Sequence, residues 1–183
     1  SCPKDDQSMV EKVKNNKELK NTKIKLIYKK GNRSIGRNEA IKNSSCEIIA
    51  CSDSGCILDK DWLKNITKPF SDKKTQVVAG YYKAKPQSLF EKCLVPYVLV
   101  MEDKVDPNKF LPSTRSIAFR KSAWEIAGGF DEKYSNNEDY VFARKLRKKG
   151  ISITFTKNTI VYWLPRKNLS DAFKMFYRFA KGD

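Results

Sequence analysis

The chain of 183 residues is long enough to fold as one domain with a buried core, and a hydrophobic content of 40% argues against wholesale disorder. Its formal charge of +16 suggests phosphate-bearing partners, namely nucleic acid, nucleotides or anionic lipid headgroups. Because most of the basic residues are Lys dispersed along the chain, with no accompanying reading motif, we expect a solvated basic surface and no binding of nucleic acid.

The use of cysteine and histidine excludes several kinds of site. The sequence has no His, and its five cysteines form no CxxC pair, so the usual zinc sites and nucleophilic machinery based on His are excluded. No apolar run is long enough to cross a bilayer. The simplest account of the cysteines is reduced thiols, which predicts a cytoplasmic location.

Strands and helices are expected to alternate along the first half of the chain. The apolar pattern predicts strands over residues 23–28, 47–52 and 76–83, and helices over residues 34–43, 61–70 and 87–101. Residues 102–114 contain an Asp-Pro pair and a further Pro, a composition typical of a loop.

The second half continues the alternation. We expect strands over residues 116–120, 151–155 and 159–163, and helices over residues 121–127, 138–149 and 168–180. Together these elements predict an α/β fold with a mostly parallel sheet and helices on both of its faces. Ligands of such sheets gather at the carboxyl ends of strands, so a polar residue directly after an apolar strand is a candidate for a site.

Asp53 occupies such a position, directly after the expected strand over residues 47–52. A carboxylate there can bind a divalent cation, because Mg²⁺ typically needs only one or two carboxylates in addition to substrate phosphates. The cation would neutralise charge that accumulates on a diphosphate leaving group. The alternative is an Asp that opens a turn before Gly55.

Asp139 lies at the expected start of a helix, next to Glu138. Acidic residues at this position often only satisfy free backbone N–H groups and complement the helix dipole. Asp139 could instead act as a general base that helps an acceptor hydroxyl attack a sugar carbon. Glu138 could orient the acceptor or fill the same role.

Residues 31–38 (GNRSIGRN) join the first expected strand to the first helix. Arg33 and Arg37 are four residues apart and therefore lie on one helical face. Guanidinium groups near a helix N-terminus could clamp a phosphate or a base edge. An ordinary surface turn is the alternative.

The last helix carries apolar residues at helical spacing, for which core packing is the favoured interpretation. The alternatives are contact with the inner face of a membrane and a channel for the acceptor.

Four segments, in this order and spacing, resemble family 2 glycosyltransferases of the GT-A fold. They are GNRSIGRNEAIKNSSCEIIACSDSGCILDKDWL (residues 31–63), STRSIAFRKSAWEIAGGFDE (113–132), NNEDYVFARKLRKKG (136–150) and VYWLPRKNLSDAFKMFYRFAKGD (161–183). The resemblance implies one Rossmann-like GT-A domain over residues 1–183. It also implies transfer of a sugar from a nucleotide-diphosphate donor, with inversion at the anomeric carbon.

The resemblance also implies roles for individual residues. Asp53 matches the first acid of the DxD motif and would bind Mg²⁺ or Mn²⁺, and Asp139 matches the catalytic base of the ED pair. Arg37 falls in the RN element beside the donor. The residues expected to bind the donor are Arg33, Arg37, Asn38, Asp53 and Arg115, and those expected to contact the acceptor are Glu138 and Trp163.

Two features depart from the family pattern. Gly55 replaces the second acid of DxD, so we expect weaker metal binding, with nearby basic groups sharing the charge. We also expect the family's first β-α-β unit to be missing from this sequence, because its opening at residues 1–6 resembles the acidic turn that follows that unit. The strand over residues 23–28 would then lose its neighbour, so we expect the chain alone to be poorly stable and to bind nucleotide weakly.

The sequence therefore predicts an inverting glycosyltransferase that serves polysaccharide, glycolipid or glycoprotein synthesis. Its partners would be a nucleotide-diphosphate sugar and a carbohydrate or lipid-linked acceptor, with peripheral membrane contact through the last helix. A catalytically degenerate module that binds sugar nucleotides is the alternative, because of Gly55 and the missing unit.

Overall fold

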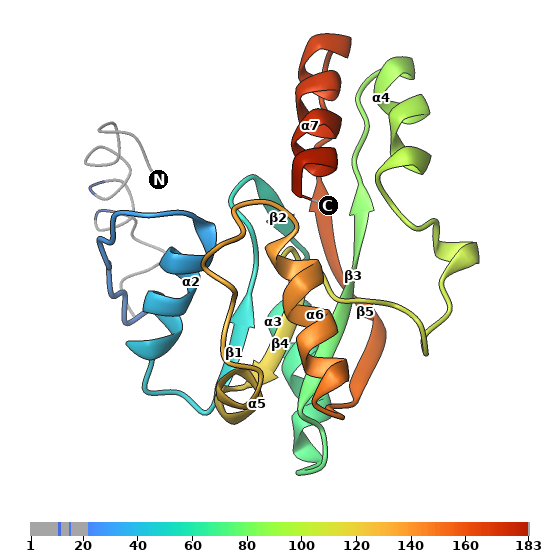
Figure 1. The fold of residues 1–183 in the computed structure, drawn as a ribbon. Helices are drawn as coiled ribbons and strands as arrows, with labels where there is room; N and C mark the ends of the chain where they lie inside the picture. The colour runs from blue at the N-terminus through green and yellow to red at the C-terminus, as the bar shows by residue number, and fades with distance from the viewer. Residues whose placement is uncertain (1–10, 12–14, 16–21, 183) are drawn as a thin grey trace.

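The computed structural model describes residues 11, 15 and 22–182. Strands in this part of the chain form one five-stranded sheet with helices packed around it (Figure 1). The order across the sheet is β1 (Ile48–Cys51), β4 (Ile117–Arg120), β3 (Val77–Ala84), β5 (Ile153–Trp163) and β2 (Cys56–Leu58).

The helices largely follow the expected periodicity. The α-helices are α2 (Arg33–Lys42), α3 (Trp62–Thr67), α4 (Leu89–Leu94), α5 (Lys121–Ile126), α6 (Glu138–Lys148) and α7 (Leu169–Gly182). Short 3₁₀ turns extend α3 and α4 and interrupt the long loop: η2 (Lys68–Ser71), η3 (Val95–Tyr97) and η4 (Glu102–Lys104). The helix expected over residues 87–101 is thus shorter, because Pro96 removes a backbone donor and tightens the chain into η3.

The sheet is mixed, so the expectation of a mostly parallel sheet is wrong, although the α/β class is confirmed. Among the described strands only β3 and β5 pair in parallel, while β1 with β4, β3 with β4, and β2 with β5 are antiparallel. The reason is that β4 enters between β1 and β3 in the reverse direction. Alternation of helical and extended patterns carries no information about this direction.

Three strands nevertheless end at the same edge of the sheet. β1 and β3 both run antiparallel to β4, and β3 runs parallel to β5, so β1, β3 and β5 point the same way. Their carboxyl ends meet at the edge where β4 begins. The expectation that ligand-binding residues follow strand ends therefore applies to this edge.

Alternate residues of the central strands face two cores on opposite sides of the sheet. Val77 and Phe119 pack with α2, α5 and α6, whereas the adjacent Val78 and Ala118 pack with α3 and η2. On the first side, the ring of Phe142 in α6 lies 5.5 Å from that of Phe119 and 4.3 Å from that of Phe130. These contacts fix α6 on the sheet.

Some strands differ from the expectation. Residues 23–28 form no strand, because no described strand lies beside them to complete a ladder. The two late strands are one, β5, and the short β2 was not foreseen. The acidic turn expected at residues 1–6 lies outside the described residues.

Helices α4 and α7 stand side by side beyond the sheet edge where the three strands end (Figure 1). Their shared core contains Leu94, Leu99 and Trp163 together with Ala172 and Met175 of α7. In the described part of the chain, no helix has the length and apolar character needed to cross a membrane.

We predict that Phe142→Ala lowers the free energy of unfolding by about 3–5 kcal/mol, because the ring is 1% exposed and its loss leaves a cavity between Phe119 and Phe130. Urea-induced unfolding followed by tryptophan fluorescence measures the change. The matched control is Leu63→Ala, whose side chain is exposed and whose loss should cost less than about 0.5 kcal/mol. Equal effects of the two substitutions would contradict this account of the core.

Candidate active site

Arg37 of α2 joins two carboxylates that are distant in the sequence. Its Nη2 donates to Asp53 Oδ1 at 2.7 Å, and its Nη1 donates to Glu138 Oε1 at 2.5 Å. Glu138 is nearly buried, with its side chain 4% exposed. Burial alone would lower the pKa of Arg37, but the charges of Asp53 and Glu138 outweigh this and raise the pKa above its ordinary value. The guanidinium therefore stays charged and holds the end of β1 against the start of α6.

Asp139 is placed by the first turn of α6. Its Oδ1 accepts a hydrogen bond from the backbone N–H of Tyr140 at 2.9 Å, and its Oδ2 accepts one from Ser113 Oγ at 2.8 Å. Ser113 precedes β4 and so comes from the sheet edge described above. The carboxylate is thus oriented from two elements, as a general base needs to be.

Two adjoining cavities open at this edge of the sheet. The larger has a volume of about 1450 Å³ and is lined by Asp53, Glu138 and Asp139 among others. The smaller has a volume of about 610 Å³ and includes Asp53 and Arg37. Residues common to both walls are Arg33, Asp53, Arg115, Asn136 and Phe179.

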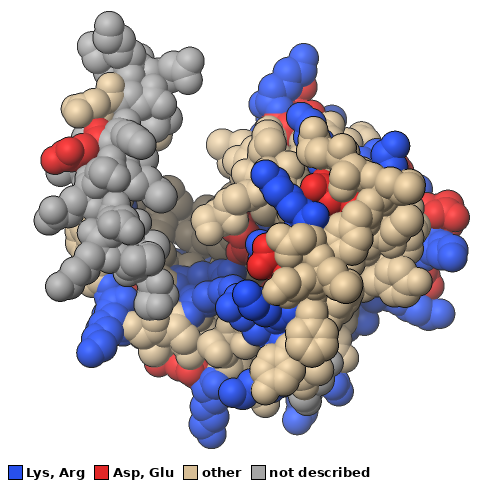
Figure 2. Space-filling view, turned by 90° about the horizontal axis from the view of Figure 1, so that it is seen from above, with Lys and Arg blue, Asp and Glu red and all other residues tan. Residues whose placement is uncertain are grey.

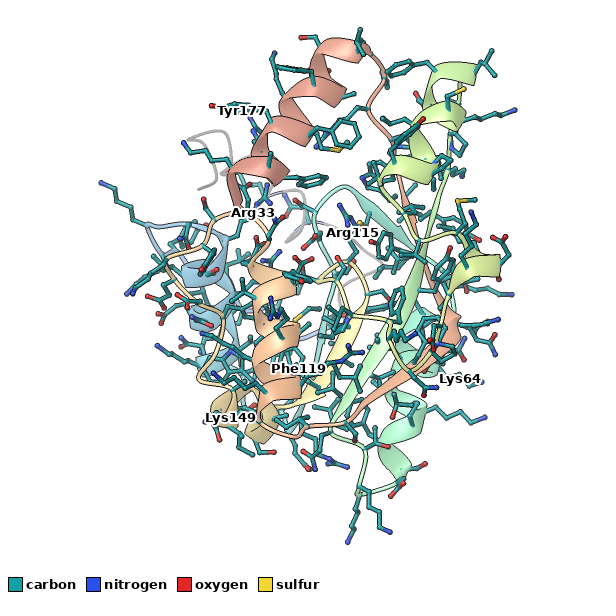
Figure 3. The ribbon with its side chains drawn as sticks, turned by 45° about the vertical axis from the view of Figure 1, so that its right-hand side comes forward. Arg33, Lys64, Arg115, Phe119, Lys149 and Tyr177 are labelled. Carbon is teal, nitrogen blue, oxygen red and sulfur yellow. The ribbon has the colours of Figure 1, made fainter. Side chains whose placement is uncertain are left out.

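The figures place this region at one end of the molecule. Figure 3 shows Arg33 and Arg115 below α7, at the opposite end of the sheet from Lys149. Seen from above, Lys and Arg side chains gather beside a hollow that also exposes acidic side chains (Figure 2). The site therefore combines a few carboxylates with an excess of positive charge.

Arg115 lies against two aromatic rings at the wall between the cavities. Its guanidinium carbon is 5.0 Å from the ring centroid of Tyr82 and 5.7 Å from that of Trp163. Both rings come from the carboxyl ends of strands, β3 and β5. Burial raises the pKa of Tyr82, although Arg115 acts in the opposite direction. The stacked guanidinium is held in place while its N–H donors remain near the cavities.

The structure brings together most residues that the sequence singled out. Asp53, Glu138, Asp139, Arg33 and Arg115 line the larger cavity. Trp163 lies in the smaller cavity beside Arg37, and the larger cavity, which contains Asp139, does not include it. The expected contact of Trp163 with the acceptor stays a prediction.

Asn38 is the exception among the expected donor-binding residues. It is buried, its Nδ2 donates to Phe130 O at 2.8 Å and Glu132 Oε1 at 3.0 Å, and its Oδ1 accepts from Trp124 Nε1 at 3.2 Å. Neither cavity includes it. Asn38 therefore anchors α2 to the segment after α5, and its expected contact with the donor stays a prediction that these hydrogen bonds do not support.

Sequence reasoning missed the contribution of the chain around α7. Arg166, Lys174 and Arg178 line the smaller cavity together with Arg37. A signal was present, because Lys174 and Arg178 are four residues apart and share one side of a helix. The interpretations offered for this helix rest on its apolar residues, and none of them uses its basic residues.

Comparison with known proteins identifies the family to which the chain belongs. Residues 3–126, more than half of the chain, match the family described as glycosyl transferase family 2. The chain belongs to glycosyl transferase family 2. Over 63 residues, 34% of its length, it is 33% identical to succinoglycan biosynthesis protein ExoA of Rhizobium meliloti (strain 1021), of which the stretch covers 19%.

Two solved structures share the fold of this family 2 domain. One is mannosyltransferase PcManGT from Pyrobaculum calidifontis in complex with GDP-Man and Mn²⁺, with a TM-score of 0.60 and 18% identity over 87% of this chain and 43% of that one. The other is S. aureus TarS 1-349 in complex with UDP-GlcNAc, with a TM-score of 0.62 and 22% identity over 92% of this chain and 48% of that one. The GT-A fold is thus confirmed, and this chain spans less than half the length of either structure.

The side chains at the site do not form a cation site held by the protein alone. One carboxylate oxygen of Asp53 already accepts a hydrogen bond from Arg37, and Glu138 is bound to the same guanidinium. Gly55 has no side chain that could bind a cation. Within the described ranges, no cluster of three His, Cys, Asp or Glu side chains is arranged to hold a metal ion. The expected Mg²⁺ or Mn²⁺ site therefore has one carboxylate, that of Asp53, and one of its oxygens is bound to Arg37.

We predict that Arg37→Met lowers the free energy of unfolding by about 3 kcal/mol, because it leaves the buried carboxylate of Glu138 without its counter-charge. Urea-induced unfolding at neutral pH measures the loss. The matched control is Arg33→Gln in the same helix, where the side chain is exposed and the change should stay within about 0.5 kcal/mol. A stability of Arg37→Met equal to that of the control would refute the bridging role.

Proposed function

We propose that this family 2 domain transfers a sugar from a nucleotide-diphosphate donor to an acceptor hydroxyl, with inversion of the anomeric configuration. The observation that carries the proposal is that Asp53 and Asp139, 86 positions apart in the sequence, line one cavity beside an arginine-rich second cavity. Family membership supports the same reaction. The relatives support a nucleotide sugar as donor, because PcManGT and TarS were solved with GDP-Man and UDP-GlcNAc.

In this proposal Asp139 is the general base. Its carboxylate takes the proton of the acceptor hydroxyl, and the hydroxyl oxygen forms a bond to the anomeric carbon. The bond between that carbon and the diphosphate oxygen breaks on the opposite face, and its electron pair leaves with the diphosphate. Ser113 donates to Asp139 Oδ2 and so keeps the carboxylate oriented. A single displacement of this kind inverts the configuration.

The other residues have supporting roles in the proposal. Glu138 is held by Arg37, so it positions the start of α6 next to the base. Arg33 and Arg115 lie on both cavity walls, where donor and acceptor would meet. Of the two acids of the family's metal motif, only the first, Asp53, is present, as the sequence predicts, so the mechanism contains no step at a metal ion.

The second candidate is a module that binds sugar nucleotides without turning them over. Gly55 favours it, because the missing acid removes one ligand from the family's metal motif. The two candidates differ in whether the donor is cleaved.

The proposal predicts that Asp139→Asn lowers the rate of donor cleavage about 10²–10⁴-fold, the range for loss of a general base. The assay measures release of nucleoside diphosphate from a panel of UDP- and GDP-sugars, with water or simple saccharides as acceptors. The matched control is Asp103→Asn, an exposed acid in η4 outside both cavities, which should leave the rate unchanged. Nucleotide binding without any cleavage would favour the second candidate, and cleavage unaffected by Asp139→Asn would overturn the assigned base.

We also propose that α7 contacts the anionic face of a membrane, where polysaccharide or lipid-linked acceptors would be handled. Leu169, Phe173 and Tyr177 recur every four residues and are 74%, 67% and 62% exposed. They form an apolar stripe on the side of α7 away from its core residues. A chain with a net charge of +16 complements an anionic bilayer.

This contact predicts binding to vesicles that contain anionic phosphatidylglycerol, weakened by salt and by the pair Leu169→Gln and Phe173→Gln. Co-sedimentation with vesicles measures the bound fraction. Leu63→Gln removes from α3 an apolar side chain that is 58% exposed and serves as the control. Binding that is equal for neutral and anionic vesicles, or that survives the α7 substitutions, would contradict this contact.

A further inference from the structure

The smaller cavity is lined by an unusual excess of cationic side chains. Six basic groups face two carboxylates, those of Asp53 and Asp171, which leaves a surplus of four positive charges. We name the six the basic cradle: Arg33, Arg37, Arg115, Arg166, Lys174 and Arg178.

We propose that the basic cradle binds the diphosphate of the donor directly, in place of a divalent cation held by the protein. This inference rests on the proposed function and specifies how its donor is held. Guanidinium groups suit the task because their N–H donors match the paired oxygens of a phosphate and their charge is permanent.

Much of the charge in the cradle is not neutralised by the protein. Arg37 is engaged with Asp53 and Glu138. In the part of the chain that the structure describes, four of the other cradle residues form no ion pair with a carboxylate: Arg33, Arg166, Lys174 and Arg178. Cations that line a cavity without counter-ions favour the binding of an anion there.

Helix α7 holds two of these cations at a fixed place. Lys174 and Arg178 are one helical turn apart, so their side chains emerge on the same side of α7. An adjoining side of α7 is anchored by Ala172 and Met175, which are buried against α4 and β5. A hydrogen bond from Asn137 Nδ2 to Phe179 O, of 3.2 Å, ties α7 to the residue just before α6. The helix that carries these two cations is therefore anchored to the rest of the site.

The turn after β1 provides only one carboxylate for a cation, that of Asp53. Gly55 has φ +82°, a left-handed conformation that side chains of L-residues rarely adopt. A second acid at this position would strain the turn that leads into β2. The carboxylate that remains, Asp53, already accepts a hydrogen bond from Arg37 Nη2. A cation at Asp53 would have to share this oxygen with a guanidinium, which disfavours it.

The test measures binding of UDP and of GDP to the full chain by isothermal titration calorimetry, in EDTA and in MnCl₂. We expect saturable binding of at least one nucleotide in EDTA, with a dissociation constant that changes less than about threefold on addition of Mn²⁺. The corresponding monophosphate should bind at least about tenfold more weakly, because it offers fewer oxygens to the cradle. Lys174→Gln combined with Arg178→Gln should weaken binding in EDTA at least about tenfold.

Two further variants keep the test independent of folding. Arg166→Gln lies before α7 and removes a cradle charge without altering the helix, so it should also weaken binding in EDTA. Lys181→Gln removes a charge from α7 outside the cavity and should leave the dissociation constant unchanged. Circular dichroism and the melting temperature show which variants remain folded.

Each result bears on the proposal. Binding that requires Mn²⁺ and disappears in EDTA would overturn the cradle but leave the proposed transferase standing. Folded cradle variants that bind as tightly as the original chain would also overturn it. If neither UDP nor GDP binds in either buffer, the cradle fails, and the proposed function fails for UDP- and GDP-linked donors.

Discussion

The ion pairs of Arg37 set the geometry on which the rest of the site depends. One guanidinium holds Asp53, after an edge strand, and Glu138, at the first residue of α6. The elements that carry these acids, β1 and α6, also pack in one core with α2. Because Asp139 follows Glu138 directly, the ion pairs of Arg37 add a polar link between the donor side and the base side of the site to this apolar packing.

The mixed sheet is compatible with this site, because only the strands that end at the site need to run in the same direction. β1, β3 and β5 end at one edge, and the loop before the reversed strand β4 arrives at the same edge with Ser113 and Arg115. Reversing β4 therefore adds residues to the site. The fold retains the functional edge of a parallel α/β sheet although most of its described pairings are antiparallel.

Local sequence signals predicted much of this molecule, and contacts between distant segments account for the rest. The helices α2 and α6 were predicted within a residue or two because periodicity and capping are local. The order of the strands could not be predicted in this way, because β5 pairs with β3 across more than 70 positions. Asp53 and Asp139 were found through their positions at element ends. Lys174 and Arg178 were missed because the apolar residues of α7 dominate its pattern, and only the packed structure shows which side meets the cavity.

Helix α7 presents three different sectors: one packed on α4, one facing the smaller cavity and one of exposed apolar side chains. A rigid helix cannot move one sector without the others. A surface that binds the outer stripe is therefore held at a fixed orientation to the cavity, because both belong to one anchored helix. Adhesion through the stripe, as proposed above, would then set the direction in which the mouth of the cavity faces that surface.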